Sequence, residues 1–78
     1  MFDERHIEKE YLKKIGKSIK EIRLSKTIKQ NEIAYRCNFD KSSYNNIEAG
    51  KRNITILNLL KIANALEIEI EQIFKNLR

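Results

Sequence analysis

The sequence predicts an all-α fold, arranged as a compact bundle of five helices. Two observations predict it: most apolar residues recur at steps of three and four residues, and the chain has no proline and only two glycines. A hydrophobic content of 41% is enough for a globular core. With 78 residues, the chain is expected to form a single domain spanning residues 1–78.

The first expected helix carries lysines around an apolar stripe made of Leu12, Ile15, Ile19 and Ile22. Gly16 lies inside this helix, where it costs up to about 1 kcal/mol relative to alanine. We expect this glycine to mark the close approach of a neighbouring helix. The helix is predicted to end before a connection at residues 25–27.

Two short helices are expected next, over residues 30–37 and from residue 41 to near Gly50. Asp40 is a strong N-cap for the later helix, whereas Lys29 is a poor N-cap for the earlier one. Between them, Asn38 is one of the few residues other than glycine that tolerate a left-handed backbone. Residues 37–39 are therefore predicted to form a tight turn between the two helices.

The last two helices are expected after Thr55, which is a good N-cap. The fourth helix is predicted to bury a stripe of Ile56, Leu59, Leu60, Ala63 and Leu66, widened by Leu57 and Ile62. A short fifth helix is predicted through Ile70, Ile73, Phe74 and Leu77.

The charge of the chain is unevenly distributed. The net charge is +5 and the pI about 9.5, which suits a polyanionic partner without identifying one. Residues 9–29 hold eight lysines and arginines against two glutamates, whereas Glu67, Glu69 and Glu71 gather near the C-terminus. One end of the molecule is therefore expected to be basic and the other acidic.

Several classes of protein are disfavoured by what the sequence contains. One cysteine and one histidine cannot form an internal disulfide or a structural zinc site, and no glycine-rich phosphate loop is present. We therefore expect no enzyme activity, cofactor, metal or small-molecule effector. No apolar run approaches the length of a membrane span, and residues 1–10 are too charged for a signal peptide. A cytoplasmic protein is the expectation.

Two short helices joined by a three-residue turn are the geometric core of a helix-turn-helix. The pattern places Ile33, Ala34 and Cys37 on the inner face of the first helix, and Tyr44 and Ile47 on the inner face of the second. The outward residues of the second helix are then short polar or cationic groups: Lys41, Ser42, Ser43, Asn45 and Asn46. Such groups can enter a major groove and hydrogen-bond base edges.

The stretch QNEIAYRCNFDKSSYNNIEAGKRN resembles the lambda Cro/repressor-type helix-turn-helix family, also called the XRE family. The resemblance covers residues 12–75 and includes the IGKSIKEIR start, Gln30, Ile33-Ala34, Ile47-Glu48, Gly50 and the LLKIANALEI…QIF ending. It implies a lambda-repressor-like five-helix bundle whose third helix reads double-stranded DNA. Glu67 stands where this family often has glycine, so an unfavourable backbone is expected there.

The resemblance also implies roles for individual residues. Gln30 would contact a phosphate, while Lys41, Ser42 and Asn46 would face bases. Ser43 and Asn45 would lie at the groove edge, and phosphates would also be touched by Lys51, Arg52 and Asn53. Arg23 and Glu48 match an ion pair between the first and third helices. The alternative for each polar residue is an ordinary solvated side chain.

A second copy of the chain is an expected partner. The C-terminal region, residues 66–78, has more large apolar side chains than a two-turn helix can hide on one face. We expect a homodimer through Leu57, Leu66, Ile68, Ile70, Ile73, Phe74 and Leu77. Two copies would set two reading helices about 34 Å apart, one turn of DNA. The alternative is that these residues belong to an ordinary core.

The leading functional hypothesis is a bacterial or phage-type transcriptional regulator, associated with the nucleoid, that binds a palindromic operator. A restriction–modification controller or a phage repressor would fit its size. The alternative is an antitoxin or other interaction module that masks a partner protein, because such proteins can share this fold. The N-terminal extension, residues 1–10, is the main part of the chain outside the resemblance, which leaves little room for a masking segment.

Overall fold

The computed structural model describes the backbone of residues 4–77 and the side chains of residues 6–77. Its helices are α1 (Glu4–Ser25), α2 (Gln30–Cys37), α3 (Lys41–Glu48), α4 (Ile56–Leu66) and α5 (Ile70–Lys75). No strand occurs within this part of the chain, so the predicted all-α fold with five helices is confirmed. Residues 1–3 of the expected N-terminal extension lie outside the described residues. None of the described helices is long and apolar enough to span a membrane.

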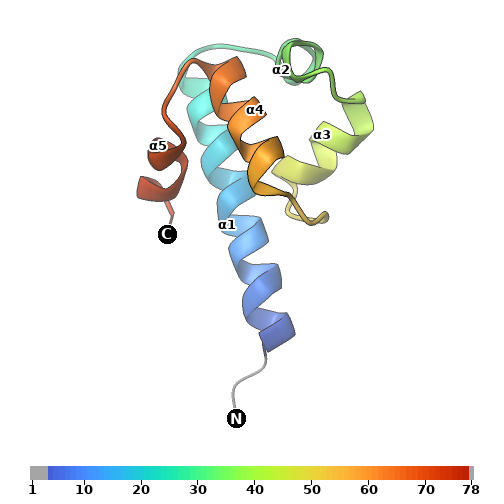
Figure 1. Cartoon of the computed structure of the whole chain (residues 1–78), viewed down its shortest axis with the longest axis vertical. Coiled ribbons are helices and arrows are strands. Elements are labelled where there is room, and N and C mark those ends of the chain that lie inside the picture. The colour runs from blue at the N-terminus through green and yellow to red at the C-terminus, as the bar shows by residue number, and fades with distance from the viewer. Residues whose placement is uncertain (1–3, 78) are drawn as a thin grey trace.

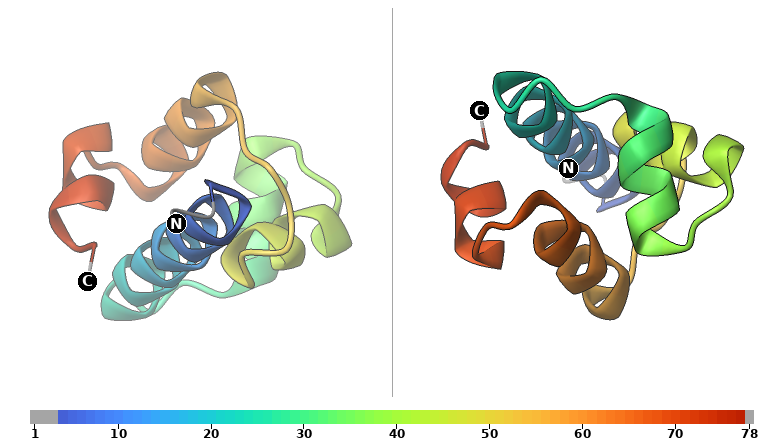
Figure 2. Two further views of the ribbon diagram at one scale, coloured as in Figure 1. Left: turned by 90° about the horizontal axis from the view of Figure 1, so that it is seen from below. Right: turned by 90° about the horizontal axis from the view of Figure 1, so that it is seen from above.

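The helices are arranged around α1, which is the longest. Helices α2 and α3 lie to one side of α1 and α5 lies to the other, while the N-terminal half of α1 extends beyond the rest of the bundle (Figure 1). The views along α1 show α4 between these two groups (Figure 2). The closest packing pairs α1 with α3 and α5, α2 with α3 and α4, and α4 with α5.

Local capping explains where α3 and α4 begin and where α2 and α4 end. The Asp40 carboxylate accepts a hydrogen bond from the Ser43 amide at 3.4 Å, and the Thr55 hydroxyl accepts one from the Asn58 amide at 3.1 Å. Lys29 makes no side-chain cap, as its residue type predicts. At the other ends, Asn38 and Glu67 adopt left-handed backbones, with φ values of 57° and 59°. Both conformations were predicted.

The core lies between α1 and the other four helices. Its largest fully buried side chains are Tyr44, Ile19, Ile33, Ile62, Leu66 and Ile73. Ile33, Ala34 and Cys37 on α2 and Tyr44 and Ile47 on α3 are buried, as predicted from their spacing. The Ser18 hydroxyl donates a 2.6 Å hydrogen bond to the Ile73 carbonyl oxygen and so joins α1 to α5.

The buried face of α4 differs from the predicted one. Three members of the expected stripe are buried: Leu59, Ala63 and Leu66. The prediction was wrong for Ile56, Leu57 and Leu60, which are 64%, 62% and 46% exposed. Ile62 is buried as predicted, and Ala65 is buried although it was not predicted to be. Apolar residues cover most of the circumference of α4, so their spacing does not select one face. The face is selected by the packing of α2 and α5 against this helix.

Some of the C-terminal residues predicted to form a dimer interface are instead buried within the single chain. Leu66 and Ile73 are 1% and 0% exposed, so they belong to the core of the single chain and are not available to a second copy. The physical reason is that α5 folds back against α1 and α4 and buries them. Ile68 and Ile70 are partly buried against the same core, and Leu77, expected in the last helix, lies beyond its end at Lys75. Leu57 and Phe74 remain exposed.

Candidate nucleic-acid interface

Helix α3 presents a polar face to solvent. Its exposed residues are Lys41, Ser42, Asn45 and Asn46, with Ser43 half-buried beside them. Tyr44, Ile47 and Glu48 point into the protein and hold the helix against α1 and α2. The five side chains predicted to face outwards are therefore brought together on one side of one rigid element. Their amide, hydroxyl and ammonium groups are those that hydrogen-bond base edges in a major groove.

The first turn of α3 is organised by Asp40. The Ser42 hydroxyl donates a 2.5 Å hydrogen bond to the Asp40 carboxylate, which also accepts from the Ser43 amide. These bonds lower the pKa of Asp40, and the bond from Ser42 is the largest cause. Because its one proton points at Asp40, the Ser42 oxygen is left as a hydrogen-bond acceptor towards solvent.

The inner end of α3 is fixed by the buried Glu48 carboxylate. It accepts hydrogen bonds from Arg23 Nε at 2.6 Å and Nη2 at 3.1 Å, which form the expected ion pair between α1 and α3. The Tyr44 hydroxyl donates to it at 2.5 Å and Gln30 Nε2 at 2.9 Å. Arg23 Nη1 also donates to the Ile28 carbonyl oxygen at 2.7 Å. One carboxylate therefore ties α1, α2 and α3 together.

The electrostatics of this cluster favour the ionised carboxylate. Burial alone would raise the pKa of Glu48, but the hydrogen bonds from Arg23, Tyr44 and Gln30 outweigh burial and lower it. Burial, and after it the hydrogen bond that Tyr44 donates to Glu48, raise the pKa of the Tyr44 hydroxyl well above its ordinary value. Tyr44 therefore stays a neutral donor and Glu48 a charged acceptor at physiological pH.

Gln30, the first residue of α2, has its side-chain amide committed to α3. Besides Glu48, Gln30 Nε2 donates to the Asn45 Oδ1 at 3.3 Å. Both amide hydrogens of Gln30 are thus directed at protein acceptors, and Asn45 is left with its own amide group as a donor. The start of α2 has no side-chain cap from Lys29, so main-chain N–H groups of its first turn remain available to an anion.

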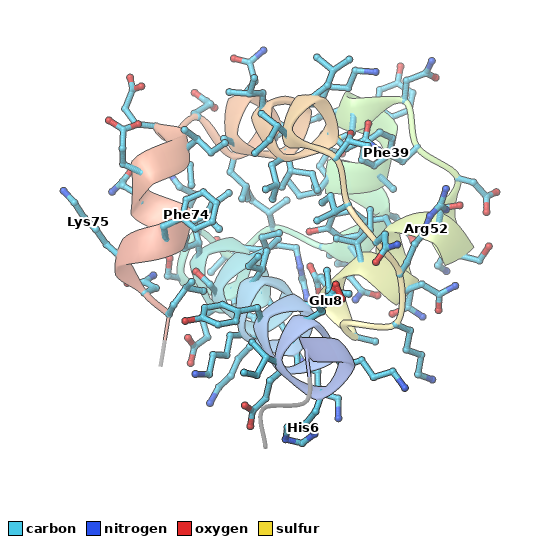
Figure 3. The ribbon with its side chains drawn as sticks, turned by 60° about the horizontal axis from the view of Figure 1, so that its bottom comes forward. His6, Glu8, Phe39, Arg52, Phe74 and Lys75 are labelled. Carbon is cyan, nitrogen blue, oxygen red and sulfur yellow. The ribbon has the colours of Figure 1, made fainter. Side chains whose placement is uncertain are left out.

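The loop after α3 carries the other predicted contact residues. Lys51, Arg52 and Asn53 are all exposed. Gly50, at the start of the loop, has a φ of 72°, a left-handed conformation that suits glycine. Figure 3 shows Arg52 on this loop, beside α3. The structure therefore places a cationic loop directly after the exposed face of α3.

Several contacts around this site were not predicted. The spacing of the apolar residues predicts an inward-facing Tyr44 ring but not the hydrogen bond from its hydroxyl to Glu48, although the four-residue separation of the two is compatible with it. Arg36 on α2 donates to the Ala65 carbonyl oxygen at 2.9 Å and pairs with Glu32 at 3.0 Å. It therefore joins α2 to the end of α4.

The single cysteine lies in the core and not on the exposed face of α3. Cys37 is buried, and burial raises the pKa of its thiol to about 11. Its Sγ lies 3.6 Å from the Lys61 carbonyl oxygen. Within residues 4–77, no group of histidine, cysteine and carboxylate side chains is placed to hold a metal ion.

Comparison with known proteins gives consistent matches. A helix-turn-helix family model matches residues 19–73. The control protein C.MunI from Mycoplasma sp. is 34% identical over 65 residues, which covers 82% of this chain and 88% of that protein.

Solved structures of controller proteins are also similar to this chain. The restriction–modification controller protein C.AhdI from Aeromonas hydrophila is 36% identical, with a TM-score of 0.78, covering 81% of this chain and 96% of that one. The controller protein C.Esp1396I, solved as a tetramer with its natural 35 base-pair operator, is 38% identical with a TM-score of 0.76. That match covers 82% of this chain and 84% of the other.

Proposed function

Because this chain belongs to the helix-turn-helix family, we propose that it is a transcriptional regulator of the restriction–modification controller type that binds a palindromic operator as a homodimer. It acts by binding double-stranded DNA, with α3 in the major groove, and performs no catalysis. The observation that carries this proposal is the exposed polar face of α3, held in place by the buried Glu48 cluster.

The α3 side chains divide into base-reading and positioning groups. Lys41 is an exposed cation that can donate to guanine, Ser42 offers an acceptor to a base amino group, and Asn46 can pair with adenine. Ser43 and Asn45 lie beside them and donate to the sugar–phosphate backbone at the groove edge. Lys51, Arg52 and Asn53 on the following loop contact phosphates, which contribute affinity without sequence preference.

Gln30 acts mainly through its main chain. Since its side-chain amide bonds to Glu48 and Asn45, the uncapped N–H groups at the start of α2 bind a phosphate, with the helix dipole favouring the negative charge. The DNA phosphate then serves as the missing N-cap. This explains why a poor capping residue such as Lys29 is tolerated there.

The dimer forms through the exposed apolar residues of α4 and α5. Leu57, Leu60 and Ile56 line the first turns of α4 and are 62%, 46% and 64% exposed, and Phe74 on α5 is 42% exposed. Ile68 and Ile70 border this surface. Large apolar side chains exposed on neighbouring turns of one helix favour association with a second copy. A second copy supplies the second reading helix that a palindromic operator needs.

Selection from a random DNA pool tests the proposal. The protein is incubated with duplexes carrying a randomised segment, bound duplexes are amplified over several rounds, and the enriched sequence is titrated by fluorescence anisotropy. We expect enrichment of a palindrome, tight binding that weakens steeply with salt, and a clear preference over random duplex. Binding without any enriched sequence would contradict the proposal.

A further inference from the structure

We infer that the projecting half of α1 forms, together with the loop after α3, a second phosphate-binding surface that extends the DNA contact beyond α3. This inference rests on the proposed DNA binding. The surface is a groove, called here the α1 groove, lined by Lys9, Leu12, Lys13, Gly50, Lys51 and Asn53. Two of its lysines lie outside the matched family segment of residues 19–73, so the family match does not assign them.

The geometry of α1 places these lysines next to the DNA-binding side. Lys9, Lys13 and Gly16 share one helical face, because they are separated by four and three residues. Gly16 is the point where α1 meets the end of α3: a Cβ at this position would lie 2.5 Å from the Ile47 carbonyl oxygen. The helical rise puts Lys9 about 10 Å beyond that contact, which corresponds to about three base pairs along a duplex.

Gly50 holds the loop against this face. A Cβ on Gly50 would lie 2.6 Å from the Lys13 Cα and 2.8 Å from its Cγ, so the loop main chain packs directly over the stem of Lys13. Lys51 follows immediately and brings a third ammonium group to the same groove. The lysines of α1 and of the loop are therefore positioned by a backbone contact.

The positive charge of the α1 groove favours an anionic partner. No carboxylate lines it, and within the described residues none of its three lysines forms an ion pair. Like charges one helical turn apart repel each other, so Lys9 and Lys13 are unfavourable neighbours in the free protein. A DNA phosphate relieves this repulsion. This phosphate belongs to the backbone of the operator DNA, because Lys51 lies in the loop that directly follows α3.

The test compares two double variants that remove the same charge. In K9Q/K13Q the glutamines keep the Cβ and Cγ atoms that pack on Gly50 but lose the ammonium groups. In K61Q/K75Q the lost charges are exposed lysines of α4 and α5, away from the groove. Binding to the selected duplex and to a random duplex of equal length is measured at several salt concentrations, with circular dichroism as a check on folding.

We expect K9Q/K13Q to lower the salt slope by about one for each lost phosphate contact, hence by about two, and to weaken both duplexes alike. K61Q/K75Q should leave the slope unchanged. Removing the base pairs that flank the half-site should lower the wild-type slope to that of K9Q/K13Q.

Equal slopes for the two variants, or a loss of sequence preference in K9Q/K13Q, would overturn the inference while the proposed function stands. If the wild-type protein itself prefers no sequence, the proposed function fails instead.

Discussion

Gly16 of α1 lies directly against the main chain of Glu48, the last residue of α3. A Cβ at Gly16 would come within 2.4 Å of the Glu48 carbonyl oxygen and 2.8 Å of its carbonyl carbon. Because these are backbone atoms at the end of a packed helix, no flexible side chain can move aside. Helix α3 is thus positioned by the absence of one methyl group, which explains a glycine in the middle of a 22-residue helix.

Gly16→Ala is therefore expected to destabilise the protein although alanine is the better helix former. The helix-propensity gain is about 1 kcal/mol, whereas forcing α1 away from α3 costs enough to leave a net loss of about 1–3 kcal/mol. Urea unfolding followed by circular dichroism measures this. Lys17→Ala, at the exposed neighbouring position, should change stability little. A Gly16→Ala variant as stable as the wild type would rule out the close contact.

The Glu48 cluster predicts a specific loss of stability in acid. The pKa of Glu48 is lowered in the folded protein, so its contribution is present above the unfolded-state value of about 4.3 and is lost as the pH falls through the folded value. Glu48→Gln should cost about 3 kcal/mol at pH 7, because it leaves the buried Arg23 without its charge partner. Unfolding free energies measured between pH 7 and pH 3 should show this difference shrinking below pH 4.

One further variant tests the hydrogen bond from Tyr44 to Glu48, and another serves as the control for lost charge. Tyr44→Phe removes one donor to a charged group and should cost about 1.5–3 kcal/mol. Glu21→Gln, an exposed carboxylate on α1, serves as the control and should change stability little at any of these pH values. A Glu48→Gln difference that stays constant down to pH 3 would show that Glu48 is not the titrating group.

Lys41→Ala tests whether the first residue of α3 reads a base. If it does, the variant should lose about 1–3 kcal/mol of binding to the selected duplex and tolerate substitutions at one base position. If Lys41 contacts only phosphate, all sequences should weaken alike and the salt slope should fall by about one. The measurement is a titration against duplexes carrying each single-base change, with Lys75→Ala as a control for lost charge.

Leu60→Glu should separate the proposed homodimer without unfolding the chain. Leu60 is 46% exposed in the single protein, so a charged side chain can remain in water there but not inside an apolar interface. Sedimentation velocity should show monomer, and affinity for the palindrome should fall to that of a half-site. Tyr35→Glu, at an 83% exposed position on α2, should leave the dimer intact. A dimeric Leu60→Glu protein would place the interface elsewhere.

Within residues 4–77, three residues other than glycine adopt left-handed backbones, and they should respond differently to substitution by glycine. Thr27, Asn38 and Glu67 have φ values of 55°, 57° and 59°. This conformation costs an ordinary L-residue about 1–2 kcal/mol, with β-branched threonine least suited and asparagine most tolerant. Stability should therefore rise most for Thr27→Gly, less for Glu67→Gly and least for Asn38→Gly, as measured by thermal unfolding. Equal effects at the three positions would contradict this order.

The sequence by itself determined the helices and the turn between α2 and α3. Their boundaries depend on residues close in the chain: Asp40 caps through Ser43, Thr55 caps through Asn58, and Asn38 tolerates its left-handed turn. The outward set on α3 followed from helical spacing alone. These features were predictable because each is a local interaction within one helical turn.

Only the tertiary structure determined which apolar residues are exposed to solvent. Helix α4 is apolar around most of its surface, so periodicity could not show that Ile56, Leu57 and Leu60 are exposed and Ala65 buried. Leu66 and Ile73 were expected at an interface, yet the return of α5 against α1 buries them within one chain. Likewise, the side-chain amide of Gln30 is committed to Glu48 and Asn45. Each outcome depends on contacts between segments far apart in the chain, which local spacing does not encode.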